Sequence, residues 1–267
     1  MRQIMRTMLG GLIDYAGLFP PAGLSMAAAV EEYNRQRLSP DAFALGRFIC
    51  PASALEDLTK QGQVLMPGTF ATSGYREMAQ AGMDEPWPVS VTIDTELGEA
   101  IAAIDAFNER HNAEDSGLAR VTTVELRVAS ASDIDAAIDG IPKALIPFFE
   151  IPLDGDPRGM IAALAGQDGL HAKIRCGGIE AAMIPDISAV ASFIMGCAAA
   201  GVPFKATAGL HHPIRAERPL TYDSEPPRAV MHGFVNVFFA AAVARARLGG
   251  AAELEGVLGE TDPAAFT

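Results

Sequence analysis

The sequence predicts an α/β protein that forms a single (β/α)8 barrel, and three observations lead to this fold class. Short apolar and β-branched runs alternate with Ala-, Leu- and Glu-rich stretches of helical periodicity. Eight strands, each followed by a helix or a long loop, follow one another at intervals of about 30 residues, and 267 residues suit one barrel of this kind. No linker of low complexity divides the chain, so we expect one domain over residues 1–267, with a helical tail from about residue 240 to 267.

The strands and helices of this barrel are predicted from the two periodicities. We expect strands at residues 11–16, 44–50, 88–94, 121–128, 144–153, 171–176, 203–208 and 232–238. We expect helices at residues 26–37, 54–65, 97–111, 132–141, 158–165, 187–200 and 240–248. Ser25 is a good N-cap for the first of these helices, and Ser53, with Glu56 three residues later, predicts a capping box for the second. Asp94 or Thr95 is expected to open the third.

A doubly wound Rossmann-type sheet is the alternative architecture. It is disfavoured because no GxGxxG motif follows the first strand. The connections at residues 67–86 and 213–228 are longer than usual. In a barrel such loops often form the mouth of the site, but a plain surface insertion is an equally good interpretation.

The charge balance restricts the class of partner. The chain has 20 Lys and Arg against 33 Asp and Glu, a formal net charge of −13, which disfavours nucleic-acid and anionic-membrane surfaces. Three cysteines without a CxxC pair fit a reducing cytoplasm, and no apolar run is long enough to predict a membrane span or a convincing signal peptide. We therefore expect a cytoplasmic protein that acts on a small molecule. The apolar tail after Gly250 leaves a homo-oligomer open.

Lysine is scarce, and its placement is informative. Only four of the 20 cations are lysines, namely Lys60, Lys143, Lys173 and Lys205. The last two fall inside predicted strands, where a lysine is least expected. A lysine on a strand is often a paired or snorkelling side chain, but two on consecutive strands favour a functional role for at least one.

Alternation along the strands groups further polar residues with these lysines. Side chains two residues apart share a face, as Lys173 and Arg175 do, and as Lys205 and Thr207 do. The same rule pairs Glu125 with Arg127, and His232 with Asn236; Glu150 lies near the end of its own run. Charged groups late in barrel strands are most simply placed at the carboxyl-terminal mouth, where they either form structural ion pairs or meet a ligand.

Two neighbouring lysines suggest Schiff-base chemistry. The reaction needs a neutral amine, whereas free lysine has a pKa near 10.4. A second cation close by, together with desolvation, disfavours the protonated form. A carboxylate such as Glu125 can then move protons, which is the logic of a class I aldolase.

Six segments of the chain carry a family resemblance. They are residues 13–18 (IDYAGL), 48–51 (FICP), 123–127 (TVELR), Glu150, 173–177 (KIRCG) and 205–210 (KATAGL). In this order and on these strands they resemble the motifs of the deoxyribose-phosphate aldolase family of class I aldolase barrels. The resemblance implies that Lys173 forms the imine and that Lys205 is its cationic neighbour, with the roles exchanged as the alternative. It also implies that Glu125 and Asp14 serve proton transfer or substrate positioning.

The chain departs from the family pattern at three places. Residues 232–236 (HGFVN) lack the Gly-Ser-type turn of the family's phosphate site, so we expect a non-phosphorylated substrate. Arg175 replaces a small hydroxyl residue and is suited to bind a substrate carboxylate with two hydrogen bonds. His211 and His212 directly follow the second lysine motif and are not part of the family pattern.

These considerations predict a carbon–carbon lyase that needs no metal or cofactor and acts on a small oxo or carboxylate compound. The expected catalytic residues are Lys173, Lys205, Glu125, Glu150 and Asp14. The expected substrate-binding residues are Arg127, Arg175, Thr207, His211, His212, His232 and Asn236.

Two alternatives remain open. His211, His212 and His232, with Glu125 or Glu150, form the donor set of a metal-dependent lyase or hydrolase. A non-catalytic barrel that binds a small acid is the other.

Overall fold

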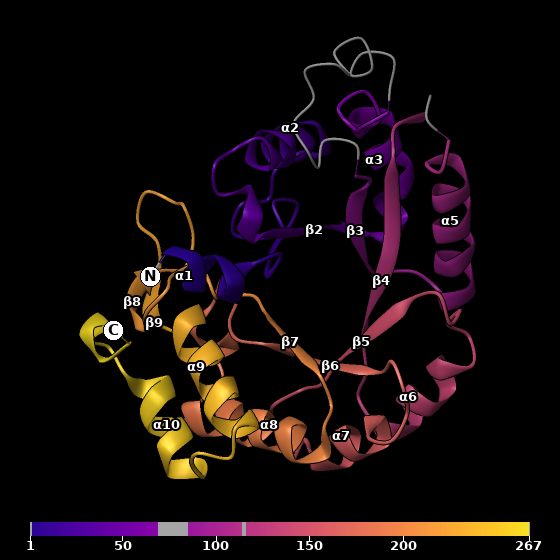
Figure 1. Ribbon diagram of the computed structural model, residues 1–267. Helices are drawn as coiled ribbons and strands as arrows, with labels where there is room; N and C mark the ends of the chain where they lie inside the picture. The colour runs from indigo at the N-terminus through magenta and orange to yellow at the C-terminus, as the bar shows by residue number, and fades with distance from the viewer. Residues whose placement is uncertain (1, 69–84, 114–115, 267) are drawn as a thin grey trace. The chain divides into compact units, whose positions relative to one another are not determined.

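The computed structural model describes residues 2–68, 85–113 and 116–266 (Figure 1). The chain divides into two compact units: Met1–Glu125 with Gly140–Leu145, and Leu126–Asp139 with Ile146–Thr267. The fold is mixed α/β, and its seven-stranded parallel sheet has the strands β1 to β7 in chain order. The α/β class is thus confirmed.

The first unit contains the first four strands of the sheet and the helices between them. Its elements are α1 (Arg2–Leu9), β1 (Ile13–Tyr15), α2 (Met26–Arg37), β2 (Leu45–Pro51), α3 (Leu55–Gly62), β3 (Trp87–Thr92), α5 (Leu97–Arg110) and β4 (Ala119–Arg127) as far as Glu125. The core holds a cluster of aromatic rings in which Tyr33 lies edge-on to Trp87, with ring centroids 5.0 Å apart, and to Phe48, at 5.3 Å. All three side chains are buried, so this cluster joins α2 to β2 and β3.

The second unit contains the rest of the parallel sheet and the carboxyl-terminal helices. Its elements are the end of β4, α6 (Ala131–Ile138), β5 (Ile146–Glu150), α7 (Arg158–Leu164), β6 (His171–Arg175), α8 (Ile187–Ala200), β7 (Phe204–Thr207), β8 (Ala216–Pro219), β9 (Arg228–Met231), α9 (Phe234–Arg245) and α10 (Ala251–Gly259). The helices α8, α9 and α10 pack side by side.

The two faces of β5, β6 and β7 differ in character. One face carries Phe149, Ala172 and Ile174, which are fully buried and share this face with Phe204 of β7. Phe193 of α8 packs edge-on against Phe204 of β7, with centroids 5.4 Å apart. The residues that alternate with these point to the opposite face, which carries the predicted charged side chains.

The predicted eighth strand at residues 232–238 is wrong. Gly233 occupies the N-cap position of α9, and the helix continues to Arg245. An apolar run of this length is compatible with a buried strand or a buried helix, and the alanines that follow at residues 240–242 favour the helix. His232 and Asn236 therefore do not share a strand face. In the described part of the chain the last two strands, β8 and β9, form an antiparallel hairpin instead.

Two of the predicted helix caps are also wrong. Ser25 caps α2 as expected, since its hydroxyl accepts a hydrogen bond from the Ala28 amide. Ser53 instead lies in a 3-10 turn, and its hydroxyl donates to Asp94 at 2.5 Å. With Asp94 engaged in this way, Glu96 is the residue that caps α5.

Of the two long connections predicted from the sequence, one is described by the structure and the other lies mainly outside the described residues. Residues 213–228 are structured, because β8 lies within them and they form most of the hairpin with β9. The connection at residues 67–86 lies mainly outside the described residues. Within the described ranges one helical segment, Ala181–Ala200, is long and apolar enough to cross a membrane, a test that core helices of soluble proteins also pass.

Candidate active site

Three of the five predicted catalytic residues lie in one row across three neighbouring strands of the second unit. In the strand register, Glu150 of β5 is opposite Lys173 of β6, and Lys173 is opposite Lys205 of β7. Register partners in a parallel sheet share a face, and adjacent strands are about 4.8 Å apart. The two strand lysines are therefore immediate neighbours on one face, as the sequence predicts.

Glu150 and Lys173 form a buried ion pair within this row. The Lys173 Nζ lies 2.7 Å from Glu150 Oε2, and the two side chains are only 8% and 10% exposed. The other carboxylate oxygen, Oε1, lies 3.4 Å from Arg127 Nε, whose side chain is 81% exposed. Burying a charge is costly unless it is paired, so Glu150 stabilises Lys173 at a place where lysine is otherwise rare.

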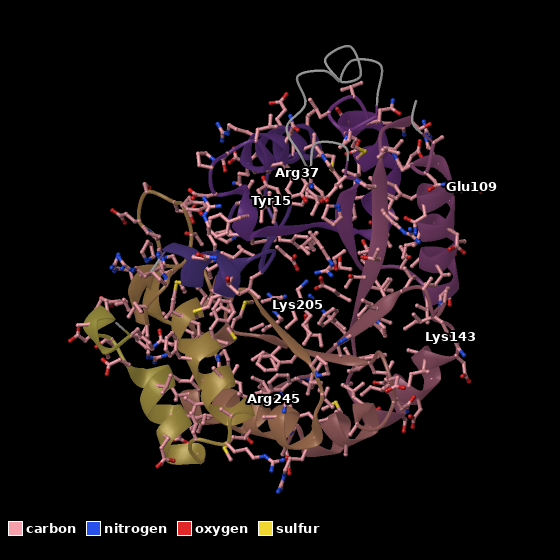
Figure 2. All side chains as sticks on the ribbon, viewed as in Figure 1. Tyr15, Arg37, Glu109, Lys143, Lys205 and Arg245 are labelled. Carbon is pink, nitrogen blue, oxygen red and sulfur yellow. The ribbon has the colours of Figure 1, made fainter. Side chains whose placement is uncertain are left out.

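An aromatic layer lies below the row, toward the amino-terminal ends of the strands. Phe148 and His171 are register partners, and their rings stack with centroids 4.8 Å apart. The Lys205 ammonium lies 5.6 Å from the centre of the Phe148 ring, a cation–π distance. Figure 2 shows Lys205 extending from β7 on the side away from α7 and α8. The Phe148 ring thus lies beneath the ammonium group of the half-buried Lys205.

A third layer lies above the row, where β6 and β7 end. Arg175 and Thr207 are register partners there, and Arg175 is exposed. The Thr207 hydroxyl donates to the Ile174 carbonyl at 3.1 Å. The Thr207 hydroxyl proton is therefore engaged in a hydrogen bond between the two strands, and this bond helps to hold β7 against β6.

Two glycines fix the chain just beyond this layer. Gly209 has a φ of +68°, and a Cβ there would lie 2.7 Å from the Gly177 Cα. A Cβ on Gly177 would in turn lie 2.9 Å from the Gly209 Cα. The backbones that follow β6 and β7 therefore touch, which only glycine permits.

The other two predicted catalytic residues belong to the first unit. Glu125 is 4% exposed, and its Oε1 accepts a hydrogen bond from the buried Ser90 hydroxyl at 2.7 Å. The Asp14 Oδ1 accepts from the Arg47 backbone amide at 2.7 Å, so Asp14 helps to hold β1 against β2. Their predicted roles in proton transfer stay predictions.

The carboxyl-terminal residues predicted to bind substrate have structural contacts. His232 is fully buried; its Nε2 donates to the Pro185 carbonyl, and its Nδ1 accepts from Arg215. Asn236 is fully buried too, and its amide bonds only backbone groups, those of Arg215, Val257 and Glu260. These contacts tie the first turn of α9 to the preceding loop and to the end of α10.

His211 and His212 lie in the loop after β7. The pKa of each imidazole is lowered from its ordinary value, mainly by desolvation. The His212 carbonyl accepts from the Phe234 amide and so satisfies one free N–H group of α9. Across the described residues, no cluster of three or more His, Cys, Asp or Glu side chains is arranged to hold a metal ion.

Sequence reasoning missed Ser90 and Phe148. A serine between two valines in a buried strand is itself a signal, because a buried hydroxyl needs a partner. Phe148 lies two residues before Glu150, so strand alternation places it on the same face.

Comparisons of the chain with protein-family models, with curated proteins and with solved structures give no match. The chemistry of the site therefore rests on its own residues: a buried amine beside a carboxylate, a second amine on the next strand, and an exposed arginine at the end of β6.

Proposed function

We propose that this protein is an aldolase-like carbon–carbon lyase that forms a Schiff base between Lys173 and a small oxo compound. The observation that carries the proposal is the row Glu150–Lys173–Lys205, with Glu150 2.7 Å from the Lys173 amine. A buried lysine between a proton acceptor and a second amine has the groups that imine formation needs.

Proton transfer from the Lys173 ammonium to the Glu150 carboxylate gives the neutral amine. Two ammonium groups on adjacent strands repel each other, and removal of one proton relieves this repulsion. The amine attacks the carbonyl carbon: a C–N bond forms, the C=O π bond breaks, and a proton passes from nitrogen to oxygen to give the carbinolamine. The proton that Glu150 took up then converts the hydroxyl group into water, which leaves as the iminium forms.

The iminium makes carbon–carbon cleavage feasible. The electron pair of the bond next to the iminium carbon moves toward nitrogen and gives an enamine, while the hydroxyl proton of the departing fragment goes to a base. Protonation of the enamine and hydrolysis return the free lysine and the second product. In this mechanism Glu150, 2.7 Å from the reacting nitrogen, is the proton carrier.

The (β/α)8 barrel is part of this proposal, with its eighth strand placed elsewhere than at residues 234–238, which lie in α9. Strands that keep chain order from β1 to β7 support it, because a doubly wound sheet reverses its order at a switch point. The resemblance of the segments at 173–177 and 205–210 to class I aldolase motifs supports it as well, since both lysines of these motifs fall in the observed row.

Reductive trapping tests the proposal. The protein is incubated with a panel of small aldehydes and oxo acids, reduced with borohydride, digested and mapped by peptide mass spectrometry. We expect a secondary-amine adduct on Lys173. No adduct on Lys173 or Lys205 with any carbonyl compound, together with activity that a chelator abolishes, would favour the metal-dependent alternative instead.

A further inference from the structure

We propose that the substrate is a short-chain oxo acid whose carboxylate binds Arg175 while its carbonyl carbon reacts at Lys173. This inference rests on the proposed function, and it names the class of compound that the same site accepts. It follows from the place of Arg175 on β6 and from what this arginine does not contact.

Arg175 lies on the same face of β6 as Lys173, one step closer to the end of the strand. It follows Lys173 by two residues on β6, so both side chains leave the same face of the sheet, from Cα atoms about 6.6 Å apart. Arg175 is the last residue of the strand and is exposed, whereas Lys173 is buried. A molecule that reaches Lys173 from the end of the strand therefore passes the guanidinium group.

The guanidinium group of Arg175 is available for a ligand. In the described residues it has no ion pair and no hydrogen-bond partner, whereas two other exposed arginines of the same unit are paired: Arg158 with Asp156, and Arg228 with Glu217. The nearby carboxylate of Glu150 is occupied on both oxygens, by Lys173 and Arg127. The planar fork of arginine matches a carboxylate with two parallel hydrogen bonds.

The neighbouring polar group cannot take over this task. Thr207, the register partner of Arg175, donates its hydroxyl proton to the Ile174 carbonyl. Of these two register partners, Arg175 is therefore the one that can donate hydrogen bonds to an anion. The two-residue spacing favours a carbonyl group next to the carboxylate or close to it, hence a short oxo acid rather than a long one.

Pyruvate and its methyl ester form a matched pair of probes, since they share the carbonyl group and differ in the charge. Each is trapped on the protein with cyanoborohydride at equal concentration, and the adduct on Lys173 is quantified. We expect the wild type to trap pyruvate at least about tenfold better than the ester, because a charged hydrogen-bonded pair is lost with the ester. Arg175→Gln removes this preference, and Arg175→Lys keeps part of it.

Arg245→Gln is the matched control, because Arg245 ends α9 in the same unit and lies away from the site. It retains the wild-type preference. Equal trapping of the two probes by the wild type, or an unchanged preference in Arg175→Gln, would overturn the inference.

A second measurement separates this inference from the proposed function. If no carbonyl compound gives an adduct, the Schiff-base function fails, and calorimetric titration with pyruvate tests the carboxylate site by itself. Binding to the wild type that Arg175→Gln abolishes supports the site. No binding to the wild type overturns it.

Discussion

Glu150 shows how a buried carboxylate can stabilise a buried lysine in a sheet. Its two oxygens face two cations, one buried and one exposed, and its own side chain is 10% exposed. Removing one partner of such a pair leaves a buried charge that water cannot solvate, so single changes are more harmful than paired ones. The same carboxylate is the proton carrier in the proposed reaction, and structure and chemistry therefore depend on the same contact.

We expect Glu150→Gln to lower the free energy of unfolding by about 3 kcal/mol, since the Lys173 ammonium loses its carboxylate at 2.7 Å. The double variant Glu150→Gln with Lys173→Met recovers part of this loss, because the buried ammonium is gone. Urea denaturation followed by circular dichroism measures both. Asp156→Asn is the control, because it breaks the exposed pair with Arg158 and is expected to leave stability unchanged. Equal effects of Glu150→Gln and Asp156→Asn would contradict the role given to burial.

The buried histidine His111 predicts a pH dependence of stability in the first unit. Its Nδ1 donates to the Gly117 carbonyl and its Nε2 accepts from Thr59, so the folded state holds the neutral ring. Its pKa is lowered, mainly by desolvation. Below about pH 6.5 the unfolded chain therefore binds more protons than the folded one, and the free energy of unfolding falls as the pH falls.

Urea denaturation at a series of pH values tests this prediction. We expect His111→Gln to flatten the slope below about pH 6.5, where the wild-type histidine begins to charge in the unfolded chain. His232, whose pKa is also lowered mainly by desolvation, acts with the same sign, so part of the slope remains. A slope identical in His111→Gln and the wild type would rule out this histidine as its source.

At the scale of the residue, strand alternation is enough to predict from the sequence which side chains share a face. Glu150, Lys173 and Lys205 lie on one face because consecutive parallel strands keep their register. The prediction is wrong at His232 and Asn236, since a short apolar run does not reveal whether it forms a strand or a helix. Once the run forms α9, Asn236 lies in its first turn and bonds backbone groups.

At the scale of the elements, the ends of β6 and β7 are held by the contact between Gly177 and Gly209. This contact follows directly after Arg175 and Thr207, so it fixes the level of the site above the lysines. The sequence shows these glycines four residues after each lysine, but the close approach of the two backbones is visible only in the structure.

We expect Gly209→Ala to destabilise the protein by more than Gly166→Ala. Both glycines have positive φ, +68° and +78°, but a Cβ at Gly166 meets nothing within 4 Å, whereas at Gly209 it meets backbone. Gly166→Ala therefore isolates the cost of left-handed backbone, about 1 kcal/mol, and Gly209→Ala adds the clash. Thermal unfolding of the two variants compares them, and equal losses of stability would show that the contact with Gly177 is unimportant.

At the scale of the whole molecule, this acidic chain has few lysines, and half of them lie inside strands, where lysine is least expected. The net charge of −13 disfavours polyanionic partners, while two of four lysines lie abreast on β6 and β7. The alternation of strands and helices predicted the α/β class and the chain order of the strands. It could not predict the hairpin β8–β9 or the early start of α9, because both depend on tertiary packing of the carboxyl-terminal segments.

Peptide mapping of the borohydride-reduced adduct in a set of lysine variants tests the proposed chemistry most directly. We expect the wild type to carry the adduct on Lys173, Lys173→Met to lose it, and Lys205→Met to form it more slowly. The control Lys143→Met changes an exposed lysine outside the row and keeps the wild-type adduct. An adduct spread over Lys60 and Lys143, or one that survives unchanged in Lys173→Met and Lys205→Met, would contradict a Schiff base in this row.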